Sequence, residues 1–391
     1  MTTVFMGPSA TQMLGDLGAD VIKVEAPGGD PTRTVGPMGD VGVGPLFLGL
    51  NRNKRSVVLD LKQDEGRLAL LRLVAGADVL AYNVRPAGME RLGLGYEDVA
   101  AVNPNIVYAG MVGFSQRGRY AAEPAFDDLI QSACGLPHAQ AAGTDGVPRY
   151  LPITIADRSV GLYAFGVICA ALYAREQTGR GQRVDIPMFE TMVPYVLGDH
   201  LYGHTFIPPK GGFGYPRITS PNRRPYRTRD GFVCCLVYTD RQWQTFLEVV
   251  GKGDWFEADP RFRDIRARTA NIDELYQLVA DELQHRTTAE WTALLKDADI
   301  PLFPVHTFDS LLQDPHLGDI GFFEEVEHPV AGRIRQTAVP SEWSDTVPGL
   351  PRPVPMLGQH SLQVLREAGL SEADIATLLA CGATADARET S

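Results

Sequence analysis

The stretch Leu151-Pro-Ile-Thr-Ile-Ala-Asp-Arg-Ser-Val-Gly161, with the apolar run behind it, decides the fold of this chain. The run at 160–173 is apolar on almost every side, which predicts a buried helix. A glycine stop at Gly179 ends that helix, and residues 182–186 are typical of a strand. Asp157 is therefore expected at a strand-to-helix turn, at the mouth of a buried helix.

Two compatible interpretations of Asp157 follow from this position. Aspartate is a favoured helix N-cap, so the residue could serve the fold alone. Alternatively, the helix N-terminus could keep the carboxylate ionised and available as a nucleophile.

Length and composition indicate a globular protein of 391 residues with room for two domains, with 44% hydrophobic and 21% charged residues. The net charge of -12 argues against general nucleic-acid binding. It leaves room for an anionic ligand, because a local basic cluster can bind phosphate inside an acidic protein.

The five cysteines show no metal-ligand spacing, and no histidine pair has a full ligand set, so no metal is expected. Adjacent Cys234 and Cys235 lie in the strand-like run 231–238 and are predicted to be reduced core thiols. We find no signal peptide and no apolar stretch long enough to span a bilayer. We therefore expect a cytoplasmic protein without a membrane partner.

Helices and short strands alternate in the first part of the chain, which is the pattern of an α/β sheet. Strands are predicted at 21–25, 56–60, 79–82 and 106–110. The loops after them are rich in Asn, Arg, Lys and Gly, and ligands bind at such strand ends. No glycine fingerprint or Walker loop is present, which disfavours a dinucleotide or ATP site.

A second region begins after the Gly/Pro/Arg-rich stretch 201–229, which is typical of a linker or binding loop. It opens with the strand at 231–238. Amphipathic helices are predicted at 243–250, 272–283 and 289–298, and a hairpin is predicted from 322–326 and 333–337.

Several motifs in this order resemble the family III CoA-transferases and cover most of the chain. They are Gly7-Pro8, the run from Leu14 to Glu25, Asn53-Lys54-Arg55-Ser56, Asn83-Val84-Arg85-Pro86, Thr178-Gly179-Arg180-Gly181-Gln182 and Leu357-Gly358-x-His360. One departure is the start, because family members carry one more strand before the Gly-Pro turn. We expect either a start upstream of Met1 or a rebuilt sheet edge.

The resemblance implies roles for individual residues. Asp157 falls on the family's catalytic aspartate, and Asp127 falls where the formyl-CoA:oxalate enzyme has a catalytic glutamate. Phe5 replaces a glutamine of that enzyme, and Phe126 stands where the related racemases have a histidine. The positions similar to CoA contacts are Arg33, Lys62, Asn83 and Arg91, with the backbones of Val4, Leu59 and Val84.

The resemblance also implies the architecture and partners. The expected fold is α/β, with a large Rossmann-like domain built from 1–204 and 326–391 and a smaller α+β domain at 205–325. Two chains would form an interlocked homodimer. The substrates would be an acyl-CoA and a carboxylic acid, with no cofactor beyond coenzyme A as cosubstrate.

Two alternatives stay open beside CoA transfer. An α-methylacyl-CoA racemase needs a second acid/base residue on the opposite face of the α-carbon, and Phe126 cannot transfer a proton. A non-catalytic CoA-binding protein would keep the basic loops without needing Asp157.

The substrate prediction rests on the loop 220–229, which carries four arginines. A solvated interdomain loop would explain them. Alternatively, Arg223 or Arg224 binds a distal carboxylate in a bidentate pair, which would favour succinyl-CoA over acetyl-CoA. The glycine-rich lid of the oxalate enzyme has no counterpart, so formyl-CoA and oxalate are not expected as substrates.

Overall fold

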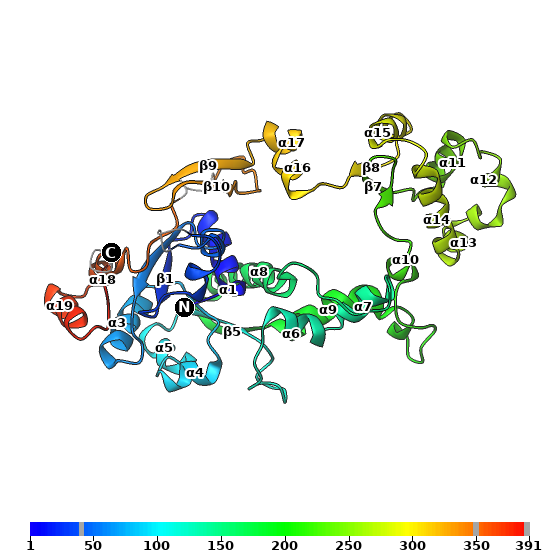
Figure 1. The fold of residues 1–391 in the computed structure, drawn as a ribbon. Coiled ribbons are helices and arrows are strands. Elements are labelled where there is room, and N and C mark those ends of the chain that lie inside the picture. The colour runs from blue at the N-terminus through cyan, green and yellow to red at the C-terminus, as the bar shows by residue number, and fades with distance from the viewer. Residues whose placement is uncertain (39–42, 347–351, 387–391) are drawn as a thin grey trace. The chain divides into compact units, whose positions relative to one another are not determined.

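A computed structural model describes residues 1–38, 43–346 and 352–386, and it divides the chain into two compact units (Figure 1). The first unit consists of 1–134, 151–193 and 319–391, and the second of 135–150 and 194–318. The longer segment of the second unit runs from 194 to 318, near the span 205–325 that we expect for the smaller domain. The unit also includes 135–150, a segment that local patterning did not separate from the first region.

Five parallel strands form two sheets of the first unit, and they confirm the mixed α/β class. They are β1 (Val21–Glu25), β2 (Lys54–Val58), β3 (Val79–Tyr82), β4 (Val107–Val112) and β5 (Gln182–Pro187). β1 pairs with β2 in one sheet, and the other sheet has the order β3-β4-β5. The described residues therefore hold two separate parallel sheets, and the single Rossmann-like sheet stays a prediction.

Helices connect and cover these strands. They are α1 (Met6–Asp16), α2 (Pro45–Leu48), α3 (Asp64–Ala75), α4 (Pro86–Arg91), α5 (Tyr96–Val102), α6 (Asp127–Ala133), α8 (Ile155–Thr178), α9 (Met188–His200), α18 (Ser361–Glu367) and α19 (Glu372–Ala380). The predicted hairpin is present as β9 (Phe323–His328) and β10 (Gly332–Thr337), which pair antiparallel.

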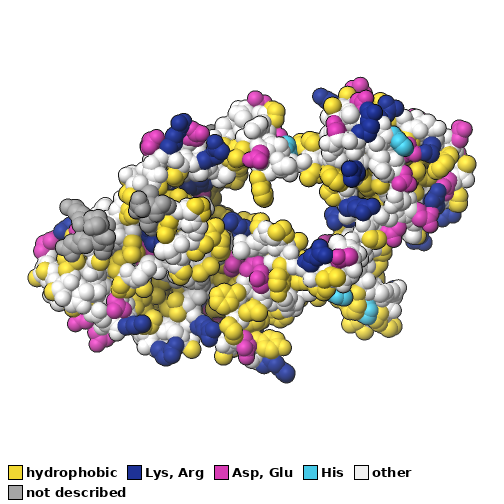
Figure 2. Space-filling view, in the orientation of Figure 1, with side chains coloured by type: hydrophobic (Ala, Val, Ile, Leu, Met, Phe, Trp, Pro, Cys, Tyr) yellow, Lys and Arg dark blue, Asp and Glu magenta, His cyan; other side chains and the backbone are white. Residues whose placement is uncertain are grey.

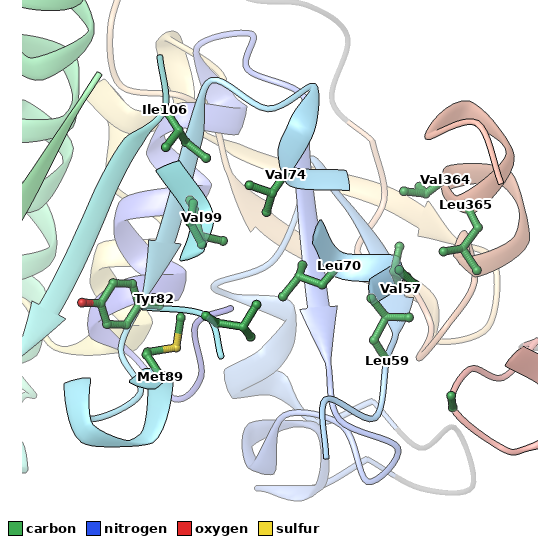
Figure 3. Packing of buried hydrophobic residues seen from close by; sticks show 14 of the residues in the cluster. Val57, Leu59, Leu70, Val74, Tyr82, Met89, Val99, Ile106, Val364 and Leu365 are labelled. Atoms are coloured by element: carbon green, nitrogen blue, oxygen red, sulfur yellow. The ribbon is translucent and has the colours of Figure 1, made fainter. Parts of the chain in front are cut away.

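The core of the first unit joins segments that are far apart in the sequence. Val57 from β2, Leu70 from α3 and Tyr82 from β3 pack in one buried cluster with Val364 and Leu365 from α18 (Figure 3). All five residues of β2 are buried, as expected for a parallel strand covered on both faces. The last helices of the chain therefore stabilise the same core as the first strands.

Helix α8 ends as predicted, with Gly179 in the left-handed conformation at φ 68°. The prediction that α8 is buried on all sides is wrong for this chain. Leu162, Tyr163 and Tyr173 are 56%, 55% and 70% exposed. Figure 2 shows other hydrophobic side chains open to solvent over the first unit. An apolar pattern identifies the positions whose side chains favour burial, but it does not show whether residues of the same chain cover them.

The expectation of no membrane-length stretch also needs correction. By length and composition alone, α8 could cross a bilayer. The helix packs on α1, α6, β4 and β5 of its own unit. These contacts account for the apolar residues on the buried face of α8 and leave those on its exposed face uncovered.

The second unit contains a small antiparallel sheet and a layer of helices. Its strands have the order β6-β7-β8, with bounds Tyr226–Arg227, Phe232–Cys235 and Leu302–Pro304. Its helices are α7 (Leu136–Ala142), α10 (Pro216–Thr219), α11 (Asp240–Val249), α12 (Trp255–Ala258), α13 (Ile265–Ala270), α14 (Ile272–Leu283), α15 (Thr288–Asp297) and α16 (Phe308–Leu312), and α17 (Pro315–Asp319) follows at its end.

Aromatic side chains fill the core of the second unit. Trp243 and Phe246 from α11 pack with Trp291 from α15. Cys235 is buried beside them, but Cys234 is exposed, so the prediction of two core thiols is wrong for Cys234. Successive side chains of a strand point to opposite faces, and only one face of β7 is covered.

Candidate active site

A cavity of about 240 Å³ lies in the first unit at the carboxyl ends of β3 and β4. Ligands bind at such strand ends in α/β folds. The cavity brings together six predicted residues: Val4, Phe5, Asn83, Val84, Phe126 and Asp157. Val4 and Phe5 precede Asp157 by 153 and 152 residues, and Asn83 and Val84 precede it by 74 and 73 residues, so only the fold brings these side chains together.

Asp157 occupies the first turn of α8, but it is not the helix cap. The N-cap position belongs to Thr154, whose side chain makes no capping hydrogen bond. The N-cap interpretation of Asp157 is therefore wrong. A carboxylate from another helix, α6, provides a hydrogen-bond acceptor for the first turn of α8. Asp127 Oδ1 accepts the backbone N–H of Asp157 at 3.0 Å.

Asp127 is itself held in place by a buried glutamine. Gln131 Nε2 donates to Asp127 Oδ2 at 2.6 Å, and the backbone N–H of Leu151 donates to Gln131 Oε1 at 3.1 Å. Both oxygens of Asp127 are thus used inside the protein. The side chain thus positions the start of α8, and the catalytic role that the resemblance implied for Asp127 stays a prediction.

Burial and a neighbouring charge dominate the electrostatics of Asp157. Desolvation, followed by repulsion from Asp127, raises the pKa of the Asp157 carboxyl to about 7, against a smaller opposing effect of Arg158. Burial therefore opposes the ionised state that we expect from the helix N-terminus, and the ionisation of Asp157 in the free protein stays a prediction.

Close contact between α1 and α8 sets the position of Asp157. A Cβ atom on Gly161 would lie 2.8 Å from the carbonyl oxygen of Met6, so only glycine allows this approach. Gly161 is one turn after Asp157 and shares its helix face. The contact therefore holds Asp157 next to the start of α1, where Val4 and Phe5 line the cavity.

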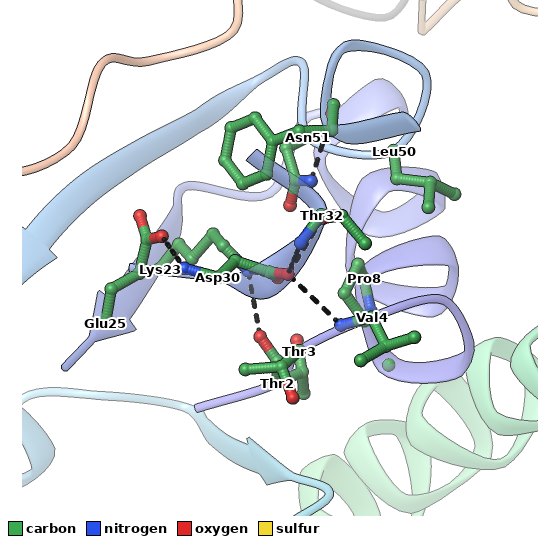
Figure 4. Close-up of polar contacts among 12 residues, drawn as sticks. Thr2, Thr3, Val4, Pro8, Lys23, Glu25, Asp30, Thr32, Leu50 and Asn51 are labelled. Atoms are coloured by element: carbon green, nitrogen blue, oxygen red, sulfur yellow. Dashed lines mark hydrogen bonds and ion pairs between the residues drawn. The ribbon is translucent and has the colours of Figure 1, made fainter. Parts of the chain in front are cut away.

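The backbone before α1 is strained. Val4 has φ 68°, a conformation that is unfavourable for a β-branched residue. Its N–H points to Asp30 Oδ1 at 3.4 Å, and the ion pair between Asp30 and Lys23 at 2.8 Å fixes that carboxylate (Figure 4). Strain of this kind is often kept where a ligand needs a particular backbone shape.

Asn83 ties the same segment to the end of β3. Its side-chain amide accepts from Thr3 N–H at 3.1 Å and donates to the Thr3 carbonyl at 2.9 Å. Arg85 and Glu123 also line the cavity, and neither was singled out from the sequence. Arg85 follows Val84 in the Asn-Val-Arg-Pro motif, so that motif carried the signal for it.

The other predicted CoA contacts lie outside this cavity. Arg33 is buried, with Nε and Nη2 on Glu25 at 2.9 and 2.7 Å and its guanidinium 3.7 Å from the centre of the Phe47 ring. The backbone N–H of Leu59 donates to the Glu25 carbonyl at 2.9 Å. Lys62 and Arg91 are exposed.

The two predicted substrate residues of the second unit are solvent-accessible. Arg223 and Arg224 are exposed in the turn that follows α10. In the described ranges no group of three or more His, Cys, Asp or Glu side chains could hold a metal ion. The ionisable side chains that line the cavity are those of Asp157, Arg85 and Glu123.

Comparison with known proteins agrees with this arrangement. Residues 1–361 match the model of CoA-transferase family III. The chain is 29% identical over 371 residues to the succinyl-CoA:glutarate CoA-transferase of Homo sapiens, covering 94% of this chain and 84% of that protein. It is 35% identical over 310 residues to the acetyl-CoA:oxalate CoA-transferase of Acetobacter aceti, covering 78% of each.

A solved structure extends the similarity to the fold. A CAIB/BAIF family protein from Brucella suis superposes with a TM-score of 0.77 at 29% identity, covering 94% of this chain and 97% of that chain. The family model spans most of the residues, including the whole cavity, and the relatives carry the names of CoA-transferases. The chain therefore belongs to the family III CoA-transferases.

Proposed function

We propose that this protein moves CoA from an acyl-CoA to a carboxylic acid through covalent intermediates on Asp157. One observation carries the proposal: the half-buried Asp157 side chain lines the cavity, and the backbone N–H of Asp157 is held by the Asp127 carboxylate. A desolvated carboxylate is a stronger nucleophile than a hydrated one, and a closed cavity protects an anhydride from hydrolysis.

The proposed reaction uses Asp157 twice. An Asp157 oxygen attacks the thioester carbonyl, the C–S bond breaks, and an aspartyl–acyl anhydride and CoA thiolate form. The thiolate then attacks the aspartyl carbonyl, which gives an aspartyl-CoA thioester and releases the first acid as its carboxylate. The acceptor carboxylate repeats the two steps in reverse, so Asp157 ends as a free carboxylate and no proton is consumed.

The raised pKa of Asp157 sets the pH range in which the reaction can start. Only the ionised carboxylate can attack, so the reactive fraction of the free enzyme grows as the pH rises through about 7.

Racemisation is the competing activity, and the presence of Phe126 in the cavity argues against it. This side chain lines the cavity, is 67% exposed, and cannot accept or donate a proton at the α-carbon. A racemase would exchange the α-proton of 2-methylacyl-CoA with deuterated water. We expect no such exchange, and exchange that depends on Asp157 would favour the racemase.

For the donor we propose an acyl-CoA with a second carboxylate, such as succinyl-CoA. Succinyl-CoA is named for the human relative, and the arginines of the loop 220–229 supply the matching charge. Arg223 or Arg224 would bind the distal carboxylate in a bidentate pair. No metal or organic cofactor beyond coenzyme A takes part in the proposed steps.

We further propose that the active form is a cytoplasmic, interlocked homodimer. The exposed apolar face of α8, with Leu162, Tyr163 and Tyr173, supports a partner chain there, since a large apolar surface is stabilised by burial. An interlocked dimer does not dissociate on dilution without unfolding. A folded monomer in light scattering would refute the dimer and would leave the proposed role of Asp157 unaffected.

The experiment that tests the proposed function is CoA transfer by Asp157→Ala across a panel of acyl-CoA donors and carboxylic acids. We expect transfer to be lost while CoA binding, measured by calorimetry, is retained. Asp128→Asn, on an exposed residue of α6, is the matched control and should leave transfer unchanged. Substantial transfer by Asp157→Ala would refute the assignment.

A further inference from the structure

Two arginines of the second unit, Arg217 and Arg223, lie beside the start of α14. Arg217 is half-buried in α10, and Arg223 is exposed in the turn that follows that helix. α10 packs on α13 and α14 (Figure 1). Nearby, Arg229 pairs with Glu290 at 2.7 Å. Among the residues that the structure describes, no carboxylate forms an ion pair with Arg217 or Arg223.

The two guanidinium groups act on one tyrosine hydroxyl. Tyr276 lies in α14, and its side chain is buried. Burial raises the pKa of this hydroxyl, whereas the charge of Arg217, a hydrogen bond from Arg217 and the charge of Arg223 oppose that rise. A neutral hydroxyl accepts a hydrogen bond, but it cannot compensate the positive charge of either arginine.

The turn that carries Arg223 is fixed to the start of α14. The buried hydroxyl of Ser220 donates to the Asp273 carboxylate, and the side-chain amide of Asn222 donates to the Asp273 carbonyl at 3.1 Å. The N–H of Arg223 donates to the Ser220 carbonyl at 3.1 Å. The Asp273 carboxylate therefore holds the turn, and the turn places Arg223 beside the helix that carries Tyr276.

An aromatic ring contacts Arg217 from another element. The guanidinium carbon of Arg217 lies 5.7 Å from the centre of the exposed Tyr238 ring. A guanidinium has five N–H donors in one plane, so donors remain for a second acceptor beside Tyr276. Like charges that act on one hydroxyl also repel each other, and a bound anion would offset that repulsion.

We propose that Arg217 and Arg223, together with the Tyr276 hydroxyl, bind the free carboxylate of a dicarboxylic substrate. Guanidinium groups bind carboxylates through parallel N–H···O bonds, and a tyrosine hydroxyl can donate a further bond. The carboxylate belongs either to the acyl end of a donor such as succinyl-CoA or to a dicarboxylic acid that acts as acceptor. This inference rests on the proposed function and adds Arg217 and Tyr276 to Arg223 as specificity-determining residues.

Thermal unfolding of the full chain tests the site without catalysis. Succinate should raise the Tm of the wild-type protein more than acetate does at equal ionic strength, because a ligand that binds the folded state stabilises it. Arg217→Met should abolish this difference. Arg227→Met, on an exposed residue of β6, should keep it. No difference in the wild-type protein, or an undiminished difference in Arg217→Met, would overturn the proposal.

Two kinetic measurements separate the sources of the carboxylate. One pairs succinyl-CoA with acetate as acceptor, and the other pairs acetyl-CoA with succinate as acceptor. We expect Arg217→Met to lower kcat/KM for the dicarboxylic partner about tenfold to a hundredfold. A loss in only one measurement assigns the site to the donor or to the acceptor. No loss in either, or an equal fall when acetyl-CoA is paired with acetate, would overturn the proposal.

Further variants distinguish this inference from the proposed function. Arg217→Lys keeps the charge but loses the planar fork, so it should lose part of the preference for succinate. Tyr276→Phe should raise KM for the dicarboxylic partner and leave kcat unchanged. Mass spectrometry of Arg217→Met mixed with acetyl-CoA should still find CoA bound to Asp157. An intact adduct with unchanged succinate preference overturns the carboxylate site alone, whereas a wild-type protein without the adduct overturns the proposed function.

Discussion

The backbone N–H of Asp157 donates to the carboxylate of Asp127, 30 residues earlier in the chain, at 3.0 Å. The same carboxylate is a source of the repulsion that raises the pKa of the Asp157 side chain. One residue therefore both orients the candidate nucleophile and sets the pH at which it is ionised. These two effects can be separated by substitution.

Asp127→Asn should lower the pKa of Asp157, because the amide keeps an acceptor for the Asp157 N–H and removes the negative charge. We expect the acid limb of the pH profile for kcat/KM to move to lower pH. Tm should fall moderately, because the new amide nitrogen faces the Gln131 Nε2 donor and one buried hydrogen bond is lost. Asp127→Ala also removes the acceptor and should lose about 0.5–2 kcal/mol of stability, as for loss of a helix cap. An unchanged acid limb in Asp127→Asn would contradict the electrostatic role of Asp127.

Asp157→Asn should stabilise the folded protein at neutral and alkaline pH. The folded state holds the Asp157 proton with a pKa of about 7, against 3.8 for an unperturbed aspartate carboxyl. Between these values the folded state binds the proton more tightly than the unfolded state, so ionisation removes stability as the pH rises. We expect the variant to exceed the wild-type Tm at about pH 8 and to match it at about pH 3.5. A variant with lower Tm at about pH 8 would contradict this.

Gly161→Ala should displace the start of α1. The new Cβ would lie 2.8 Å from the Met6 carbonyl oxygen, so backbone must shift, and we expect a loss of about 1–3 kcal/mol together with reduced transfer. Gly198→Ala, in α9, is the control, because no atom lies within 4 Å of its Cβ. It should stabilise α9 by about 0.5–1 kcal/mol. Equal effects of the two substitutions in urea unfolding would refute the close packing of α1 on α8.

Arg223→Met and Arg224→Met test the proposed donor. A charge-assisted hydrogen bond is worth roughly 1.5–3 kcal/mol, so loss of the binding arginine should lower kcat/KM for succinyl-CoA about tenfold to a hundredfold. Activity with acetyl-CoA should be retained. Arg227→Met serves as control, since Arg227 is exposed in β6 of the same loop region. An equal fall with both donors, or no change with either, would show that the loop is structural.

Local patterns predicted the elements of this fold well. The strands β1 and β3, the helix α14 and the end of α8 at Gly179 follow from apolar spacing and turn residues, which act over a few positions. The extent of the second unit was harder to predict, because residues 135–150 belong to it through contacts that no local sequence pattern indicates. The exposed face of α8 was missed for the same reason.

The site could be predicted as a set of residues but not as an electrostatic environment. The motifs around Asn83 and Asp157 pointed to residues that the cavity brings together. The protonation of Asp157 could not be predicted, because it depends on burial and on Asp127, a residue brought close only by folding. The carboxylate that accepts an N–H in the first turn of α8 likewise comes from another helix, so the residues around Thr154 give no sequence signal for it.

The most direct test of the central claim is mass spectrometry of the protein after mixing with an acyl-CoA in the absence of acceptor. Digestion should give a peptide in which CoA is bound to Asp157 as a thioester, and adding the acceptor acid should remove that mass as new acyl-CoA forms. The adduct should be absent from Asp157→Asn. Transfer by a protein that forms no adduct, or an adduct on a residue other than Asp157, would contradict the account.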